Sequence, residues 1–201
     1  MRGQAAGLLA LGAMMTMASP ARAGIDEIHF GVMDHNVCIT NCKNADKEDS
    51  PNIEGQISFD SPSFLHWALS PQPYIMGSYN TQGDTSFGAV GLEWRWDVSE
   101  HWAIEPGLGY AIHNGVKNNP YANGTPESAD FSSKHVLLGS RDLFRTSLGV
   151  TYDMDGPWEV QAYFEHLSHG QILGHGRNQG LDELGIRIGY QFGQRHRADS
   201  Q

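Results

Sequence analysis

The sequence predicts an all-β protein, an eight-stranded antiparallel up-and-down transmembrane β-barrel. Apolar and polar residues alternate with a period of two in segments of about 8 to 12 residues, separated by clusters of Asp, Asn, Gly, Pro and Ser. Closed up-and-down barrels prefer an even number of strands, and eight such segments can be counted. They lie near residues 26–33, 52–60, 72–80, 85–97, 101–113, 136–153, 157–168 and 182–192.

The two faces of each segment differ in polarity. In the seventh segment, Trp158 and Phe164 lie on one face, and Glu159 and Glu165 on the other. A soluble ligand-carrying barrel would turn the apolar face inward, whereas an outer-membrane barrel turns it toward lipid. The polar faces combine charges of both signs with many glycines, which suits a narrow, filled interior, and Trp and Tyr recur at segment ends. These patterns favour an outer-membrane barrel over a soluble one.

The chain divides into three parts. Residues 1–23 combine an early positive charge, an apolar run over 8–15 and an Ala-x-Ala site directly before Gly24, which predicts a secretory signal peptide. The apolar run is too short to cross a bilayer as a helix, which takes about 20 residues. We expect the barrel domain to occupy residues 24–192 and a polar C-terminal tail to occupy 193–201.

The charge balance excludes one class of partner. The chain has 23 acidic residues against 13 Lys and Arg, a formal net charge of −10. Nucleic-acid binding needs clustered Lys and Arg to replace counterions along the phosphate backbone. We therefore expect no nucleic-acid partner.

The two cysteines, Cys38 and Cys42, lie four apart in a polar stretch downstream of the export signal. Exported proteins form disulfides readily, so a loop disulfide is the favoured interpretation. A redox-active pair would need Cys-x-x-Cys spacing, and a zinc site would need two further ligands nearby.

The connections predict the direction of the strands. If the chain begins on the periplasmic side, odd-numbered strands rise to the cell surface, with short turns below and longer loops above. Residues 97–100 and 154–157 are short lower turns, whereas 34–51 and 114–135 are long upper loops. The connection 61–69 is long for a periplasmic turn and is interpreted as an amphipathic turn in the membrane interface.

A candidate hydrolase site lies at the upper end of the seventh segment. His166 and Ser168 are two apart in an extended strand, so they share one face about 7 Å apart along the strand. A serine needs a base to take its proton, histidine titrates near neutral pH, and a carboxylate fixes the imidazole tautomer. Asp182 has the outward parity of these two residues, whereas Glu183 points inward. Backbone amides after Ser168, or the Asn178 side chain, are candidate oxyanion donors.

Outward parity places this site among lipid headgroups, where acyl esters of lipopolysaccharide or phospholipid lie. Two alternatives remain open from the residues alone. His and Ser near a strand end are common, so a non-catalytic barrel with a structural or surface-binding role is one. Metal binding by His166, His169 and His175 is the other, and it needs converging nitrogens.

Several stretches are similar to the PagL-type outer-membrane lipid A 3-O-deacylases, also called the acyloxyacyl hydrolase family. The His-x-Ser step is the specific part, and the similarity extends over nearly the whole exported chain. The similar stretches are Glu165-His166-Leu167-Ser168, Asn178-x-Gly180-Leu181, Pro73 to Thr85, Gly139 to Phe144, and Gly189-Tyr190-Gln191-Phe192.

The resemblance implies a lipid-facing triad that removes the 3-linked (R)-3-hydroxyacyl chain from lipid A. By position, His166 matches the family base, Ser168 the nucleophile, Asp182 the acid and Asn178 a residue of oxyanion stabilisation. The implied location is the bacterial outer membrane, the implied partners are lipopolysaccharide and outer-membrane lipids, and no cofactor or metal is expected. The sequence leaves the oligomeric state open, a homodimer included.

This chain departs from the family pattern in four ways. His169 follows the serine where members commonly have Asn, and the loop from Ser168 to Asn178 is longer than in the type enzyme. The acid is Asp182 where the type enzyme has Glu, so the shorter side chain is expected to orient the base less well. Finally, nine residues follow Phe192, whereas such barrels often end on an aromatic residue.

Overall fold

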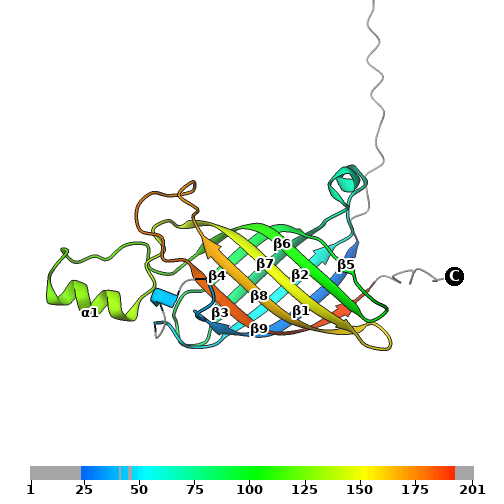
Figure 1. Ribbon diagram of the computed structural model, residues 1–201, viewed down its shortest axis with the longest axis horizontal. Helices are drawn as coiled ribbons and strands as arrows, with labels where there is room; N and C mark the ends of the chain where they lie inside the picture. Colours follow the sequence, from blue (N-terminus) through cyan, green and yellow to red (C-terminus); the bar gives the residue numbers. More distant parts are fainter. Residues whose placement is uncertain (1–23, 41, 45–46, 193–201) are drawn as a thin grey trace, which may run out of the picture.

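The computed structural model describes residues 24–40, 42–44 and 47–192, so the predicted signal peptide and C-terminal tail lie outside it. The described chain forms a barrel with long loops and helix α1 (Pro126–Lys134) at one end (Figure 1). The 3-10 helix η2 (Ser63–Ala68) projects at the other end, and a second one, η1 (Cys42–Asn44), lies among the long loops. Within the described ranges, no helix has the length and apolar character needed to cross a membrane.

The sheet is antiparallel and closed, which confirms the predicted eight-stranded barrel. Strands adjacent in the chain pair, except for β4 and β5; β1 pairs with β9, and β4 pairs with β6. The two-residue β5 also pairs with β6, so it continues the line of β4 and adds no separate strand. The strands are β1 Ile25–His35, β2 Asn52–Phe59, β3 Gln72–Asn80, β4 Phe87–Glu93, β5 Trp96–Asp97, β6 Trp102–His113, β7 Asp142–Asp153, β8 Trp158–Ser168 and β9 Leu181–Gln191.

The interruption between β4 and β5 has a local cause. The Trp94 N–H donates to the carbonyl of Pro106 at 2.9 Å, and a proline has no N–H to return to the ladder. Directly after this point Arg95 turns inward and pairs with Glu105 and Glu159. The predicted segment 85–97 is therefore one strand that is interrupted opposite Pro106.

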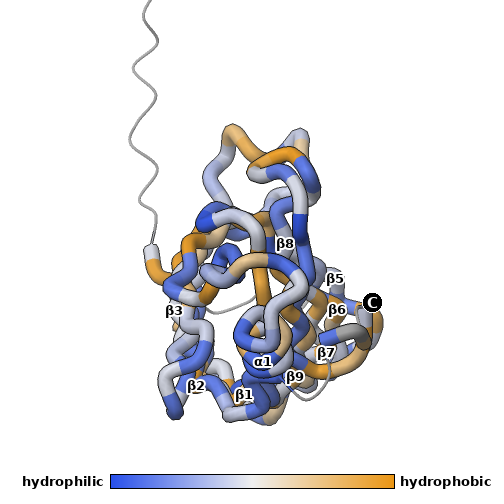
Figure 2. Tube along the Cα trace, turned by 90° about the vertical axis from the view of Figure 1, so that its left-hand side faces the viewer, coloured by the Kyte–Doolittle hydropathy of each residue, from blue (hydrophilic) through white to orange (hydrophobic). Residues whose placement is uncertain are grey.

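The apolar face of the barrel is outside, as the alternation predicts. Val160 and Ile186 are 37% and 64% exposed, whereas the next residues along their strands, Gln161 and Arg187, are fully buried. Figure 2, which looks toward the end that carries α1, shows hydrophobic and hydrophilic residues interspersed along the chain. This arrangement contradicts the soluble ligand-carrying barrel, because its apolar residues would have to line the interior.

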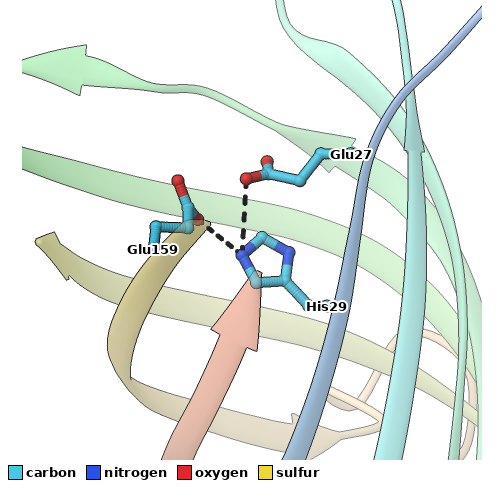
Figure 3. A group of neighbouring side chains, drawn as sticks. All are labelled: Glu27, His29 and Glu159. Atoms are coloured by element: carbon cyan, nitrogen blue, oxygen red, sulfur yellow. Dashed lines mark hydrogen bonds and ion pairs between the residues drawn. The ribbon is translucent and has the colours of Figure 1, made fainter. Parts of the chain in front are cut away.

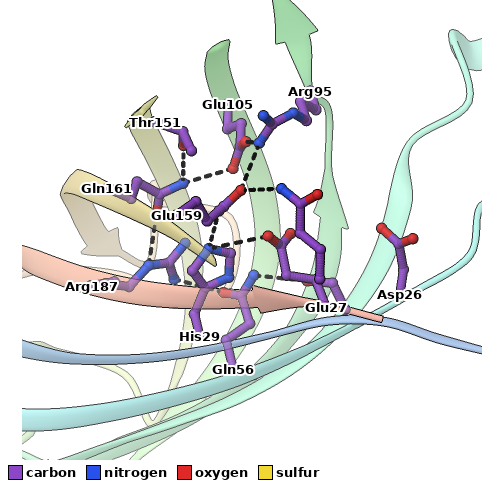
Figure 4. Close-up of polar contacts among 12 residues, drawn as sticks. Asp26, Glu27, His29, Gln56, Arg95, Glu105, Thr151, Glu159, Gln161 and Arg187 are labelled. Atoms are coloured by element: carbon purple, nitrogen blue, oxygen red, sulfur yellow. Dashed lines mark hydrogen bonds and ion pairs between the residues drawn. The ribbon is translucent and has the colours of Figure 1, made fainter. Parts of the chain in front are cut away.

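The interior is filled by hydrogen-bonded charged side chains. The Arg187 guanidinium donates to Glu54 at 2.9 Å, to Gln56 at 3.0 Å and to Gln161 at 2.7 Å. It also lies 3.4 Å from the centroid of the Tyr163 ring. Figure 4 shows how the contacts continue from Arg187 through Gln161 and Glu105 to Arg95. The buried charge of Arg187 thus has several partners, as burial in a low-dielectric interior requires.

An apolar cluster lies at the upper end of the interior, beside buried polar groups. Val136 and Leu138, from the loop before β7, are fully buried against inward residues of several strands. Residues 136–141 were predicted to belong to a strand, and that prediction is wrong: β7 begins at Asp142. Gly139 adopts a φ of +76°, which ends any extended run there and lets the apolar residues fold into the barrel mouth.

Two connections differ in detail from plain loops. The upper connection 114–135 contains α1, whose first turn is capped by the Thr125 side chain with Pro126 at its start. The lower connection 61–69 contains η2, with Trp67 84% exposed beside exposed Phe64 and Leu69. An apolar turn of this kind agrees with the predicted amphipathic segment, and its place in the interface remains a prediction.

Candidate active site

The candidate residues lie where β8 ends and β9 begins. His166 and Asp182 are direct partners across the two antiparallel strands. The next pair, Leu167 and Leu181, points inward, is fully buried and belongs to the apolar cluster at the barrel mouth. Because side chains alternate along a strand, the buried leucines hold His166 and Asp182 on the outer face.

The imidazole and the carboxylate form a direct hydrogen bond, with His166 Nδ1 2.6 Å from Asp182 Oδ1. An ionised carboxylate can only accept, so Nδ1 carries the proton and Nε2 presents a lone pair. The His166 side chain is 25% exposed and that of Asp182 only 2%. The pair therefore has a covered acid and an accessible base, the arrangement that general-base chemistry needs.

Ser168 is the last residue of β8 and lies on the same face as His166. It pairs with Phe144 of β7 and is half-buried. Among the residues that the structure describes, no hydrogen bond joins Ser168 Oγ to His166. Such contacts are often long before substrate binds and tighten in the reacting complex, so the shared face is the relevant observation.

The side chain of His169 holds the loop from His169 to Gly180 by hydrogen bonds to its backbone. The fully buried ring accepts a hydrogen bond from the Gln171 N–H at Nδ1, over 3.1 Å. Nε2 therefore carries the proton and donates to the Arg177 carbonyl, also over 3.1 Å. With both ring nitrogens occupied by backbone groups, His169 has none left for a metal ion, which removes one ligand of the alternative metal site.

Asn178 lies beside the first backbone amide after the serine. The N–H of His169 donates to Asn178 Oδ1 at 3.4 Å, a long hydrogen bond. Both predicted sources of oxyanion donors, the backbone amide and the Asn178 side chain, thus lie together at the end of β8.

Gly180 lies next to the base and has a φ of +66°, a conformation that side chains disfavour. A Cβ at this position would lie 2.9 Å from His166 Cε1. Glycine therefore leaves the imidazole room beside the start of β9. The sequence similarity includes this residue, but its reason is visible only in the structure.

Thr40 is the contact that sequence reasoning missed. Its N–H donates to Asp182 Oδ2 at 2.5 Å, and its hydroxyl donates to Asp182 Oδ1 at 2.8 Å. The same hydroxyl oxygen lies 3.0 Å from His166 Nδ1. Thr40 lies in the upper loop between Cys38 and Cys42, which a disulfide joins. No spacing in the sequence connects this loop to residues more than a hundred positions away.

Among the residues that the structure describes, two groups of acidic and histidine side chains have ligand atoms close enough to hold a cation, and both lie inside the barrel. In the first, His29 Nε2 is 2.7 Å from Glu159 and 3.7 Å from Glu27 (Figure 3). The same Glu159 carboxylate also accepts from Arg95 and Gln191, so its charge is already balanced by protein groups. The second group consists of Glu54, Glu165 and Glu183. Neither group faces the exterior, so we assign both to the interior hydrogen-bond network.

Fold and site together define a class of protein: an outer-membrane β-barrel that carries a hydrogen-bonded histidine–aspartate pair on its outer face. The sequence model of the family described as "Lipid A 3-O-deacylase (PagL)" matches residues 53–191, and the chain belongs to this family. It is therefore an enzyme, a deacylase of the bacterial outer membrane. No match is found among curated proteins.

Solved structures of membrane β-barrels are similar to this chain. The chain resembles the crystal structure of the outer membrane enzyme PagL with a TM-score of 0.56 at 12% sequence identity, covering 82% of this chain and 98% of that one. A de novo designed transmembrane β-barrel follows with a TM-score of 0.49 at 10% identity, covering 84% and 96%. Neisserial surface protein A has a TM-score of 0.45 at 10% identity, covering 83% and 96%. At these identities the first of them supports the barrel fold alone.

Proposed function

We propose that this chain is a carboxylic ester hydrolase that removes the 3-linked (R)-3-hydroxyacyl chain from lipid A of lipopolysaccharide. Ser168 is the nucleophile, His166 the general base and Asp182 the acid that orients it. The observation that carries the proposal is the hydrogen-bonded His166–Asp182 pair on the lipid-facing surface, with Ser168 two residues along the same face.

The proposed reaction has two halves. Ser168 Oγ attacks the ester carbonyl while His166 Nε2 takes the serine proton, and the imidazolium then protonates the departing sugar oxygen, which leaves as a hydroxyl. The acyl group remains on Ser168 until water, activated by the same nitrogen, hydrolyses it and restores the serine. The products are a fatty acid and a lipid A with one free hydroxyl. Asp182 stays ionised and stabilises the charged ring.

The oxyanion that forms on the carbonyl needs donors. In the proposal it takes the His169 N–H, which the substrate-free chain engages in a long hydrogen bond to Asn178 Oδ1. Rotation of the Asn178 amide then presents its NH₂ group as a second donor. Asn178→Asp is expected to weaken catalysis because it replaces a donor with a negative charge beside the oxyanion.

The substrate class follows from location and family. An outward site at the upper strand ends meets lipid of the outer leaflet, where acyl esters lie at headgroup depth. The family description supports lipid A and the 3-position. Free fatty esters in water are not expected to be good substrates, because the exterior around the site is built to contact lipid.

The test is mass spectrometry of defined lipid A incubated with purified enzyme in detergent micelles. Wild type is expected to release one 3-hydroxyacyl chain, and Ser168→Ala to lower the rate by about 10³-fold or more. Thr146→Val is the matched control, because Thr146 is the exposed partner of His166 on β7 and has no role in the proposal. Release by Ser168→Ala at the wild-type rate would disprove the nucleophile. Loss of a chain from another position would disprove the 3-position, and no release from any lipid would favour the non-catalytic barrel.

A further inference from the structure

Thr40 holds the carboxylate of Asp182 at both oxygens. The backbone N–H binds Oδ2 and the hydroxyl binds Oδ1, at 2.5 and 2.8 Å. A carboxylate held at both oxygens cannot rotate about its last bond without breaking one of these contacts. The oxygen that accepts from His166 is therefore fixed by a residue outside the three catalytic positions.

The carboxylate that Thr40 binds is also shielded from water. Asp182, the second residue of β9, lies on the outer face of the barrel, where the alternation alone would leave it exposed, yet its side chain is 2% exposed. Hydrogen bonds in such a covered position are stronger than in water, because the local dielectric constant is lower. The loop that carries Thr40 thus strengthens the contact between the acid and the base.

The residues on both sides of the Cys38–Cys42 loop form hydrogen bonds to residues at or just before the start of β9. Before Thr40, the Val37 N–H donates to the Asp182 carbonyl at 3.0 Å. After it, Asn44 Nδ2 donates to the carbonyls of Gln179 and Gly180, at 2.7 and 3.1 Å. The flanks therefore bring the loop to the site, but they do not determine where Thr40 itself points.

The disulfide constrains the segment between these flanks. It joins Cys38 to Cys42, so the chain that carries Thr40 is a ring with three residues between the two cysteines. Closing so short a ring removes most of the conformations that a free loop would sample. Cys38 and Cys42 are both exposed, so a soluble reductant can reach the bond.

We propose that Thr40 is a positioning residue for the catalytic acid and that the Cys38–Cys42 disulfide keeps it in place, so that deacylase activity depends on the redox state of the loop. The proposal rests on the proposed function, because it assigns Asp182 the role of the acid. Reduction by a dithiol breaks the S–S bond and forms two thiols. The reductant supplies two electrons and two protons and becomes a cyclic disulfide.

The first test asks whether the Thr40 hydroxyl positions Asp182 or whether Thr40 only supports the fold of the loop. Thr40→Val removes the hydroxyl but keeps the backbone N–H and the size of the side chain, and it is expected to lower kcat about 10- to 100-fold with little change in KM. Thr40→Ser restores a hydroxyl and is expected to recover most of the lost kcat. Ile39→Ala, in the same ring with an exposed side chain, is the matched control. Equal kcat for wild type and Thr40→Val would overturn the role of Thr40.

The second test addresses the disulfide with the full, folded enzyme. Dithiothreitol is expected to lower kcat on micellar lipid A about tenfold, and reoxidation is expected to restore it. The double variant Cys38→Ser/Cys42→Ser should have this lower kcat with or without reductant. Heat-dependent migration on electrophoresis checks that each barrel remains folded. If the wild-type protein is active and neither reduction nor the double variant changes kcat, the redox proposal fails while the proposed function stands. If wild type releases no acyl chain, the proposed function itself fails.

Discussion

Neighbouring residues of β9 form two histidine–carboxylate pairs. The pairs consist of the same kinds of side chain but lie on opposite faces of the barrel wall. Asp182 points outward and bonds His166 at 2.6 Å, while Glu183 points inward and bonds His35 at 2.5 Å. The inner histidine has a carboxylate at each ring nitrogen, because Glu48 lies 3.4 Å from its Nε2. The outer histidine uses Nδ1 alone and leaves Nε2 available.

Both ring nitrogens of the inner histidine face a carboxylate, whereas only one ring nitrogen of the outer histidine does. Glu183 also accepts from Asn52 and Ser78, so its carboxylate lies in a closed network inside the barrel. A group whose partners are all protein groups contributes to the fold, whereas a base with an open nitrogen on an accessible face can take a proton from another group. Because consecutive side chains of a strand point to opposite faces, Asp182 lies in the pair that can react and Glu183 in the pair that supports the fold.

Neutralising each acid in turn gives the largest expected contrast. Asp182→Asn should lower kcat about 10³- to 10⁴-fold with the barrel intact, because the amide no longer favours the required tautomer. Glu183→Gln should keep kcat within about tenfold but lower the free energy of unfolding by about 1–3 kcal/mol, because it weakens a buried hydrogen-bonded charge. Kinetics on lipid A and denaturant unfolding in lipid vesicles measure the two effects. A folded Glu183→Gln enzyme as inactive as Asp182→Asn would contradict this separation.

The space around the outer histidine can be tested with alanine at two glycines of the same loop. Gly180→Ala places a methyl group against the His166 ring and is expected to lower kcat about 100-fold, since small displacements of a catalytic group cost that much. Gly176 also has a positive φ, +92°, but a Cβ there would meet no neighbour within 4 Å. Gly176→Ala therefore imposes similar backbone strain without the clash. Similar losses in both variants would show that backbone strain, and not the position of His166, explains the effect.

The smallest expected effect concerns Glu48, which connects the upper loops. Its carboxylate accepts from Thr85 and from the Val136 N–H, at 2.7 and 2.8 Å, and faces His35. Burial raises the pKa of Glu48, but hydrogen bonds from His35, Thr85 and Val136 outweigh it and hold the pKa below the ordinary 4.5. Because the carboxyl pKa is lowered on folding, the ionised Glu48 stabilises the folded loops fully above the ordinary pKa of 4.5. This stabilisation is lost as the pH falls from 4.5 through the lowered pKa.

Hydrogen exchange of the upper loops measures this dependence. Wild type should open more readily as the pH falls below about 4.5, after correction for the intrinsic exchange rate. The upper loops of Glu48→Gln should be less protected from exchange at neutral pH, and their protection should depend less on pH. Asp49→Asn, at the exposed neighbouring residue, should behave like wild type. A Glu48→Gln protein with unchanged protection would mean that Glu48 does not connect the loops.

Much of the barrel could be predicted because alternation is a local property. A strand that faces lipid on one side and a filled interior on the other must repeat every two residues, and the sequence carries this repeat without knowledge of strand partners. The same rule separates Asp182 from Glu183. It fails at residues 136–141, where apolar residues point into the barrel mouth from a loop, and a run of apolar residues looks alike in a strand and in a buried loop.

The site shows the same division. Parity and residue type identify His166, Ser168 and Asp182 as candidates, and Asp182 contacts the base directly although it is shorter than the Glu of the type enzyme. The contacts of Thr40 with Asp182 span 142 positions, and only the folded chain brings them together. The sequence by itself determined which residues share a face, because that depends on backbone geometry between near neighbours. The tertiary structure decided which loop covers the acid, because barrel closure alone sets which distant segments meet at the strand ends.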